Sequence, residues 1–125
     1  MIIGVDARPL NKKTLTGIGT YLYRVLQELQ IIESKRQNPN HYILFSNKPY
    51  TFVDGLDDSI FEKVVIPFKI GPLWPALKLK SALTKYSVNV FWGAQNMLPP
   101  TVKGIKYILT IHDLVLVINP AWGAF

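Results

Sequence analysis

The sequence predicts an α/β fold, in which a doubly wound, mainly parallel sheet of about five strands carries helices on both faces. Three observations predict it. Apolar runs of strand length recur along the chain, amphipathic segments of helical length separate some of them, and two runs are apolar without alternation. Unbroken apolar runs are typical of parallel strands with both faces covered, so this fold is favoured over a sandwich of two sheets.

Five short segments have the composition of strands, being rich in branched and aromatic residues. They are residues 2–6, 42–45, 64–66, 88–92 and 107–111. Pro67 ends the third, because proline cannot donate a hydrogen bond to a sheet. The fifth is entirely apolar, which is typical of a strand covered by helices and flanked by another strand. We expect that flanking strand to be absent from residues 1–125, which leaves the fifth strand with an unpaired edge.

Two segments have the periodicity of amphipathic helices. The first begins at Gly17 and is expected to end before residues 38–40, because Pro39 disfavours a helical conformation in the residue before it. The second is expected over residues 73–86, with lysines among its polar positions. The predicted order of elements is β-α-β-β-α-β-β.

The composition indicates one domain over residues 1–125, and a multidomain enzyme is excluded by this length. With 49% hydrophobic residues, the chain can offset its ordering entropy. The absence of cysteine excludes disulfides, a thiolate nucleophile and sulfur-ligated zinc. The first residues lack the pattern expected of a signal peptide, and no apolar run approaches the roughly 18 residues of a membrane span. We expect a cytoplasmic protein that is soluble or peripheral to a membrane.

Positive charge is concentrated in the second half of the chain. The formal net charge is +6; residues 1–62 carry seven basic and seven acidic side chains, whereas residues 63–112 contain seven lysines and no acid. This asymmetry indicates either a solvated surface or an anionic partner, such as lipid headgroups or a phosphorylated substrate. Nucleic acid is a weaker candidate, because the lysines lack interleaved aromatic residues and a compact basic motif.

Ligands of open α/β sheets bind beyond the carboxyl ends of the strands, so segments at that edge are candidate sites. Residues 6–9 follow the first predicted strand, and residues 16–20 lead into the first helix. Gly17 and Gly19 would let backbone N–H groups approach a phosphate, which a helix N-terminus also attracts. Leu22 stands where a dinucleotide-binding motif has its third glycine, and a turn without a ligand explains the glycines equally well.

Trp92 and Asn96 belong to the segment that follows the fourth predicted strand. The amide can hydrogen-bond to a sugar or a base, and the tryptophan ring can stack on it, although loops often carry such residues without a function. His112 follows the fifth strand, and we expect its imidazole at the mouth of a central strand, facing the same crevice as the glycines. A lone histidine is more often structural than catalytic, and Asp113 is expected to cap the next turn.

Four motifs occur in an order that is more specific than any one of them. They are Gly4-Val5-Asp6-Ala7-Arg8, Thr16-Gly17-Ile18-Gly19-Thr20-Tyr21-Leu22, Leu98-Pro99-Pro100 and Thr110-Ile111-His112-Asp113-Leu114. Together they resemble the amino-terminal half of family 4 glycosyltransferases of the GT-B fold, over nearly the whole chain. The resemblance implies two Rossmann-like domains across a cleft, a retaining transfer from a nucleotide-diphosphate sugar to an acceptor, and no metal or cofactor.

The resemblance also implies roles for individual residues. Gly17 and Gly19 match glycines that border the donor diphosphate and the reacting sugar, and His112 matches a histidine beside the donor sugar. We place Arg8 with the donor-phosphate residues, and Trp92 and Asn96 with the acceptor. The family's paired glutamates belong to a carboxyl-terminal domain that these residues do not include, so we expect a truncated amino-terminal domain, inactive alone.

The expected chemistry suits these residue types. Departure of a nucleoside diphosphate builds negative charge on phosphate oxygens, which fixed N–H donors stabilise. A neutral imidazole at His112 would orient an oxocarbenium-like sugar by hydrogen bonding rather than attack it. The sequence offers no convincing carboxylate nucleophile. The alternative is a noncatalytic α/β module that binds an anionic ligand or a partner protein.

The carboxyl-terminal segment is apolar, including residues 114–118, Ala121, Trp122 and Phe125. An unpaired apolar edge tends to recruit another chain. We therefore expect a homo-oligomer formed through this region.

Overall fold

The computed structural model describes residues 1–119 and 121, which form an α/β fold around one five-stranded sheet. The strands are β1 (Ile2–Asp6), β2 (His41–Ser46), β3 (Phe61–Val65), β4 (Val90–Gly93) and β5 (Lys106–Leu109), in the order β3-β2-β1-β4-β5. Every neighbouring pair is parallel. The predicted Rossmann-like sheet is therefore confirmed, with β1 at its centre.

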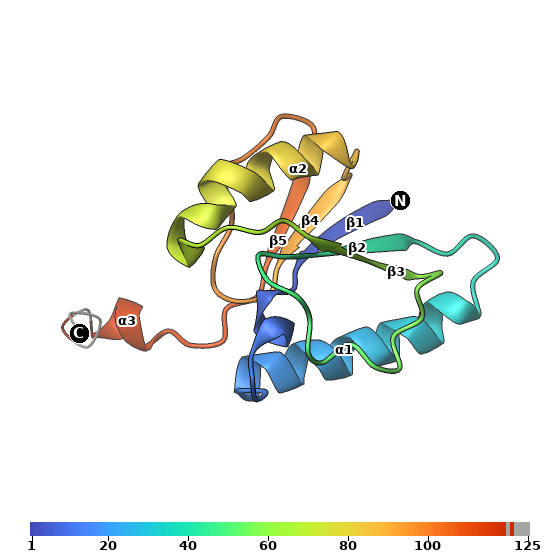
Figure 1. Ribbon diagram of the computed structural model, residues 1–125, viewed down its shortest axis with the longest axis horizontal. Helices are drawn as coiled ribbons and strands as arrows, with labels where there is room; N and C mark the ends of the chain where they lie inside the picture. The colour runs from blue at the N-terminus through green and yellow to red at the C-terminus, as the bar shows by residue number, and fades with distance from the viewer. Residues whose placement is uncertain (120, 122–125) are drawn as a thin grey trace.

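Helices cover both faces of the sheet, as the doubly wound prediction requires (Figure 1). Helix α1 (Gly17–Ser34) lies on one face, where Leu22 and Leu26 are fully buried against side chains of β1 and β2. Helix α2 (Lys80–Lys85) and the turns before it lie on the other, where Trp74 and Leu83 are buried beside Phe91 of β4. Both cores are apolar, so burial of these side chains supplies most of the driving force for folding.

The first helix has the predicted start and stop. Thr16 is its N-cap, and its side-chain oxygen accepts a hydrogen bond from the Gly19 N–H at 3.4 Å. Such a cap satisfies one of the N–H groups that have no partner within a helix. The helix ends at Ser34, four residues before Asn38, in agreement with the expected effect of Pro39.

The second helix is not the single element predicted over residues 73–86. It consists of the 3-10 turn η2 (Gly71–Leu73), the π-helical turn η3 (Pro75–Leu79) and α2. The Lys80 N–H donates to the Pro75 carbonyl, five residues earlier. Pro75 stands at the start of this wider turn, where its missing N–H leaves no bond unmade.

Strand β5 lies at an edge of the sheet, in agreement with the expected unpaired edge, whereas the expectation that it is a central strand is wrong. Ile108 and Leu109 are 54% and 38% exposed. Within residues 1–119 and 121 no further strand pairs with β5. The strand ends at Leu109 rather than Ile111, because the chain turns and the His112 N–H bonds to a side chain instead of a neighbouring strand.

Two short elements were not predicted, namely the 3-10 turn η1 (Arg8–Asn11) and helix α3 (Val115–Ile118). The Val115 N–H donates to Asp113 Oδ1 at 2.6 Å, so the expected cap at Asp113 is confirmed. Helix α3 stands apart from the sheet (Figure 1). Trp122 and Phe125, part of the expected oligomer surface, lie outside the described residues.

Candidate functional site

Most of the candidate residues gather at the carboxyl edge of the sheet, where β1, β4 and β5 end. The end of β1 supplies Asp6 and η1 supplies Arg8, while Gln95 and Asn96 follow β4 and His112 follows β5. Parallel strands direct their carboxyl ends to one edge, so residues far apart in sequence meet there.

Asp6 and Arg8 form a buried ion pair, with relative exposures of 1% and 8%. Arg8 Nε donates to Asp6 Oδ1 at 2.9 Å, and Arg8 Nη2 donates to Asp6 Oδ2 at 2.7 Å. The same carboxylate accepts a hydrogen bond from Gln95 Nε2 at 2.9 Å. Two parallel bonds between a guanidinium and a carboxylate are strong and directional, so the Asp6 carboxylate is held firmly.

The remaining contacts of Arg8 are also within the protein. Its Nη1 donates to the Gly71 carbonyl at 3.1 Å, and its guanidinium carbon lies 4.9 Å from the Trp74 ring centroid. Arg8 thus connects the end of β1 to the segment that precedes α2. Because these partners occupy the guanidinium, Arg8 contributes to the packing of this edge.

Negative charge at Asp6 also affects a buried phenol. Burial raises the pKa of Tyr50 well above its ordinary value, and the charge of Asp6 raises it further. The Tyr50 hydroxyl donates to the Leu44 carbonyl at 2.5 Å. Tyr50 is therefore a neutral hydrogen-bond donor at physiological pH, and it helps to fix the end of β2.

The two glycines at the start of α1 have different surroundings. Gly19 is buried, and a Cβ there would lie 2.9 Å from a Leu15 methyl group and 3.1 Å from the Pro9 carbonyl oxygen. Gly17 is exposed, with no atom within 4 Å of its would-be Cβ. Gly19 thus permits close packing, whereas Gly17 leaves the helix N-terminus open to a ligand.

His112 is fixed by two hydrogen bonds and one aromatic contact. Its Nε2 lies 2.6 Å from the Ala94 carbonyl oxygen, and its backbone N–H donates to Asn96 Oδ1 at 2.7 Å. The Tyr21 ring packs edge-on against the imidazole, with centroids 5.0 Å apart. A carbonyl oxygen only accepts, so Nε2 carries a proton, and Nδ1 is the acceptor in the neutral form of the ring.

The contact with Tyr21 joins His112 to the first turns of α1, which contain Gly17. The sequence predicts that the imidazole and this turn face the same crevice, and in the structure both lie at the same edge of the sheet. The prediction that His112 follows a central strand is wrong, because His112 follows the edge strand β5. Tyr21 and Gln95 were not singled out, although both lie within motifs or segments that were.

The two residues expected to bind the acceptor, Asn96 and Trp92, lie in different parts of the structure. Asn96 lies beside His112 and has a φ of 60°, in the left-handed region that asparagine tolerates better than most residues. Trp92 is only 9% exposed, and its Nε1 donates to Thr110 Oγ1 at 2.8 Å on the α1 face of the sheet. Trp92 lines an apolar groove of about 350 Å³ there, together with Ile3, Val25, Leu29, Tyr42, Ile108 and Thr110. Asn96 thus positions His112, and Trp92 packs within the sheet.

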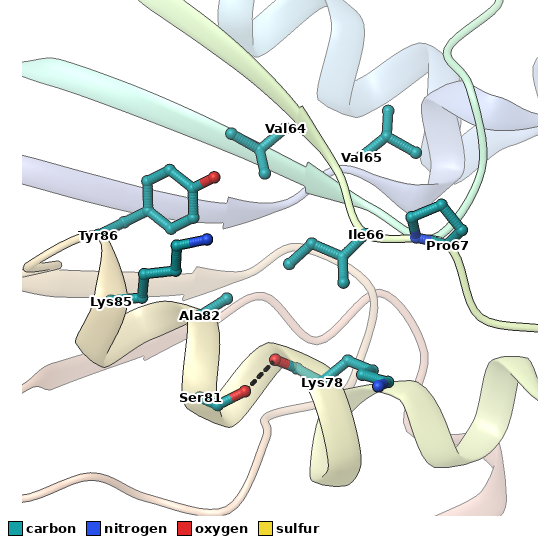
Figure 2. A pocket seen from close by; sticks show the side chains of 9 residues that line it. All are labelled: Val64, Val65, Ile66, Pro67, Lys78, Ser81, Ala82, Lys85 and Tyr86. Carbon is teal, nitrogen blue, oxygen red and sulfur yellow. Dashed lines mark hydrogen bonds between the residues drawn. The ribbon is translucent and has the colours of Figure 1, made fainter.

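A larger cavity of about 460 Å³ lies between the end of β3 and helix α2 (Figure 2). The strand side is apolar and the helix side contributes two lysines; the lining residues are Val64, Val65, Ile66, Pro67, Lys78, Ser81, Ala82, Lys85 and Tyr86. The lysines are visible in the sequence as positive charge, but the cavity is not, because its two sides are more than ten residues apart in the chain.

In the described part of the chain, no group of three His, Cys, Asp or Glu side chains is arranged to hold a metal ion. Across residues 1–119 and 121, no helix has both the length and the apolar character needed to span a membrane. Comparisons with protein-family models, curated proteins and solved structures found no match to this chain.

Proposed function

We propose that this chain is the acceptor-side part of a retaining glycosyltransferase that uses a nucleotide-diphosphate sugar. The observation that carries the proposal is the meeting of His112 with the first turns of α1, through Tyr21 at 5.0 Å, at the carboxyl edge of a parallel sheet. Ligands of such sheets bind at this edge. The class of reaction is proposed from the four sequence motifs, and the gathering of residues at this edge supports the proposal.

In this proposal the start of α1 faces the donor diphosphate. Helix α1 has 18 residues, and the positive end of its dipole is at Gly17. The Gly19 N–H is used by the Thr16 cap, so the N–H groups of Gly17 and Ile18 are the donors for phosphate oxygens. These donors stabilise the charge that builds on the leaving diphosphate.

His112 orients the reacting sugar. Its Nε2 proton is held by the Ala94 carbonyl, which leaves Nδ1 as an acceptor for a sugar hydroxyl. Asn96 fixes the backbone of His112 and acts as a positioning residue. No step requires the imidazole to form a bond to carbon.

The test is a screen of nucleotide-diphosphate sugars on the full-length gene product, followed by His112→Ala. We expect turnover to fall about 100-fold or more, the scale of losing a contact at a reacting centre. His41→Ala is the matched control, because this half-buried histidine pairs with Glu62 and starts β2 at the opposite edge. Unchanged kcat in a folded His112→Ala protein would remove His112 from the site.

Asn96→Gly separates positioning from folding, because glycine tolerates the left-handed backbone while lacking the side-chain acceptor. We expect a smaller loss of turnover than for His112→Ala, with little change in thermal stability.

A second candidate, a noncatalytic module that binds an anionic ligand, is favoured by the seven lysines of residues 63–112. If the full-length product transfers no sugar from any donor yet binds a nucleoside diphosphate, this second candidate replaces the first.

A further inference from the structure

The segment of residues 69–80, which leads into and begins the helical cover of the second core, combines exposed aliphatic side chains with exposed lysines. Ile70, Leu73 and Leu77 are 54%, 48% and 57% exposed, although each is a large apolar residue. Lys69 precedes them in the chain, and Lys78 and Lys80 follow them. We name the exposed side chains of this segment the basic helical face, and it consists of Lys69, Ile70, Leu73, Leu77, Lys78 and Lys80.

The positive charge of the basic helical face is not neutralised by neighbouring carboxylates. Residues 63–112 contain no acid. In the described part of the chain, the salt bridges use Arg8, Arg36, His41 and Lys63, and none uses a lysine of this face. Lys78 Nζ lies 5.6 Å from the Phe68 ring centroid, a contact that leaves its charge unchanged.

The exposed leucines belong to a segment whose inner side is already packed. Trp74 is fully buried and its Nε1 donates to the Ile66 carbonyl at 2.9 Å. Leu79 is fully buried in the same core. The apolar side chains of the outer side are therefore surplus to the core, and they are presented on a firmly held backbone.

The cavity between β3 and α2 also combines apolar side chains with lysines, and it shares Lys78 with the basic helical face. Lys78 and Lys85 lie on the helix side and Ile66 and Pro67 on the strand side (Figure 2). An apolar lining beside ammonium groups fits a molecule with a hydrocarbon part and a negatively charged group.

We propose that the basic helical face binds the surface of a membrane that contains anionic phospholipids. Leu73 and Leu77 enter the boundary between headgroups and acyl chains, and the lysines contact lipid phosphates. Charge complementarity identifies the occupant, because an anionic bilayer offers negative charge and hydrocarbon side by side without needing a matched shape. This inference does not depend on the glycosyltransferase activity proposed above.

The test measures co-sedimentation of the 125-residue chain with vesicles of phosphatidylcholine, alone or mixed with phosphatidylserine. We expect binding only to the mixed vesicles, and weaker binding as salt is raised. Lys78→Gln with Lys80→Gln should weaken binding roughly 30-fold, since each lysine near such a surface contributes about a fivefold factor. Leu73→Ser with Leu77→Ser should weaken it about tenfold or more.

Two matched control pairs lie on exposed positions elsewhere. Lys12→Gln with Lys13→Gln removes the same charge beside η1, and Ile31→Ser with Ile32→Ser removes similar apolar area on α1. We expect less than about a twofold effect of the isoleucine pair, and only the small long-range loss expected of distant charges from the lysine pair. Circular dichroism establishes that each variant is folded.

Equal binding to neutral vesicles, no vesicle binding, or equal losses in the control pairs would overturn the proposal. Binding to RNA without binding to vesicles would assign the lysines to nucleic acid and would also overturn it. If a variant fails to fold, hydrogen exchange of the unmodified chain decides. Anionic vesicles should slow exchange in residues 70–80 and not in residues 31–36, and the absence of this difference refutes the proposal.

Discussion

Replacing Arg8 with alanine should destabilise the fold strongly, and this distinguishes a structural role from a phosphate-binding one. The substitution leaves Asp6, 1% exposed, with Gln95 as its remaining side-chain partner. It also removes the hydrogen bond to the Gly71 carbonyl and the contact with the Trp74 ring. A phosphate ligand would instead be exposed and free of carboxylate partners.

The expected loss is about 3–5 kcal/mol, the cost of leaving a buried charge without its partner. This is a large part of the roughly 5–15 kcal/mol that stabilises most domains. Replacing both partners, with Asp6→Asn and Arg8→Met, should cost less than Arg8→Ala alone, because no charge then stays buried and the volume is retained. Comparing the single and double variants thus separates the cost of burying an unpaired charge from the attraction between Asp6 and Arg8.

Urea denaturation followed by tryptophan fluorescence measures these losses. Lys12→Ala is the control, because Lys12 is exposed and lies just after η1. A loss below about 1 kcal/mol for Arg8→Ala, together with weaker binding of a nucleoside diphosphate, would refute the reasoning and return Arg8 to the donor-phosphate residues.

Three further predictions concern pH, backbone space and assembly. Burial raises the pKa of Glu33, but hydrogen bonds to its carboxylate outweigh this and hold the pKa below the ordinary value. The ionised Glu33 side chain therefore stabilises the folded state above its unfolded-state pKa, and this stabilisation is lost as the pH falls towards its folded-state pKa. The urea midpoint should drop between about pH 6 and pH 3, and the drop should be smaller in Glu33→Gln. A Cβ at Gly93 would lie 2.2 Å from the Met97 carbonyl oxygen, so Gly93→Ala should lower the Tm sharply, whereas Gly17→Ala, with open space around it, should not. The exposed edge at Ile108 should support a homo-oligomer, and light scattering that gives a monomer mass at micromolar concentrations would contradict this.

Features set by neighbouring residues could be predicted from the sequence. Helix α1 begins at the predicted Gly17, because the Thr16 cap and the apolar period are both local. The same is true of the Asp113 cap, whose partner is two residues away. The parallel sheet also follows from local patterns, since unbroken apolar runs between helices leave few alternatives.

Features that depend on residues far apart in the chain could not be predicted from the sequence. The bond from Arg8 to Gly71 joins residues 63 positions apart, and nothing near Arg8 in the sequence indicates it. An apolar run shows that a strand forms but not where it lies in the sheet, which is why β5 was placed wrongly. The orientation of Trp92 depends on the register of β4, which the sequence leaves open.

Arg8 contacts segments of both proposed sites. On one side, Arg8 pairs with Asp6, which accepts a hydrogen bond from Gln95, the neighbour of Asn96. Asn96 in turn accepts a hydrogen bond from the backbone of His112. On the other side, Arg8 donates to the carbonyl of Gly71, two residues before Leu73 of the basic helical face. A membrane bound at that face would therefore lie in a fixed orientation to the carboxyl edge of the sheet. We propose that the bound membrane presents an acceptor to this edge, which would link the proposed activity to the proposed docking face. If so, the full-length product should transfer sugar faster to an acceptor in anionic vesicles than to the same acceptor in neutral detergent micelles, and Leu73→Ser with Leu77→Ser should abolish only that difference.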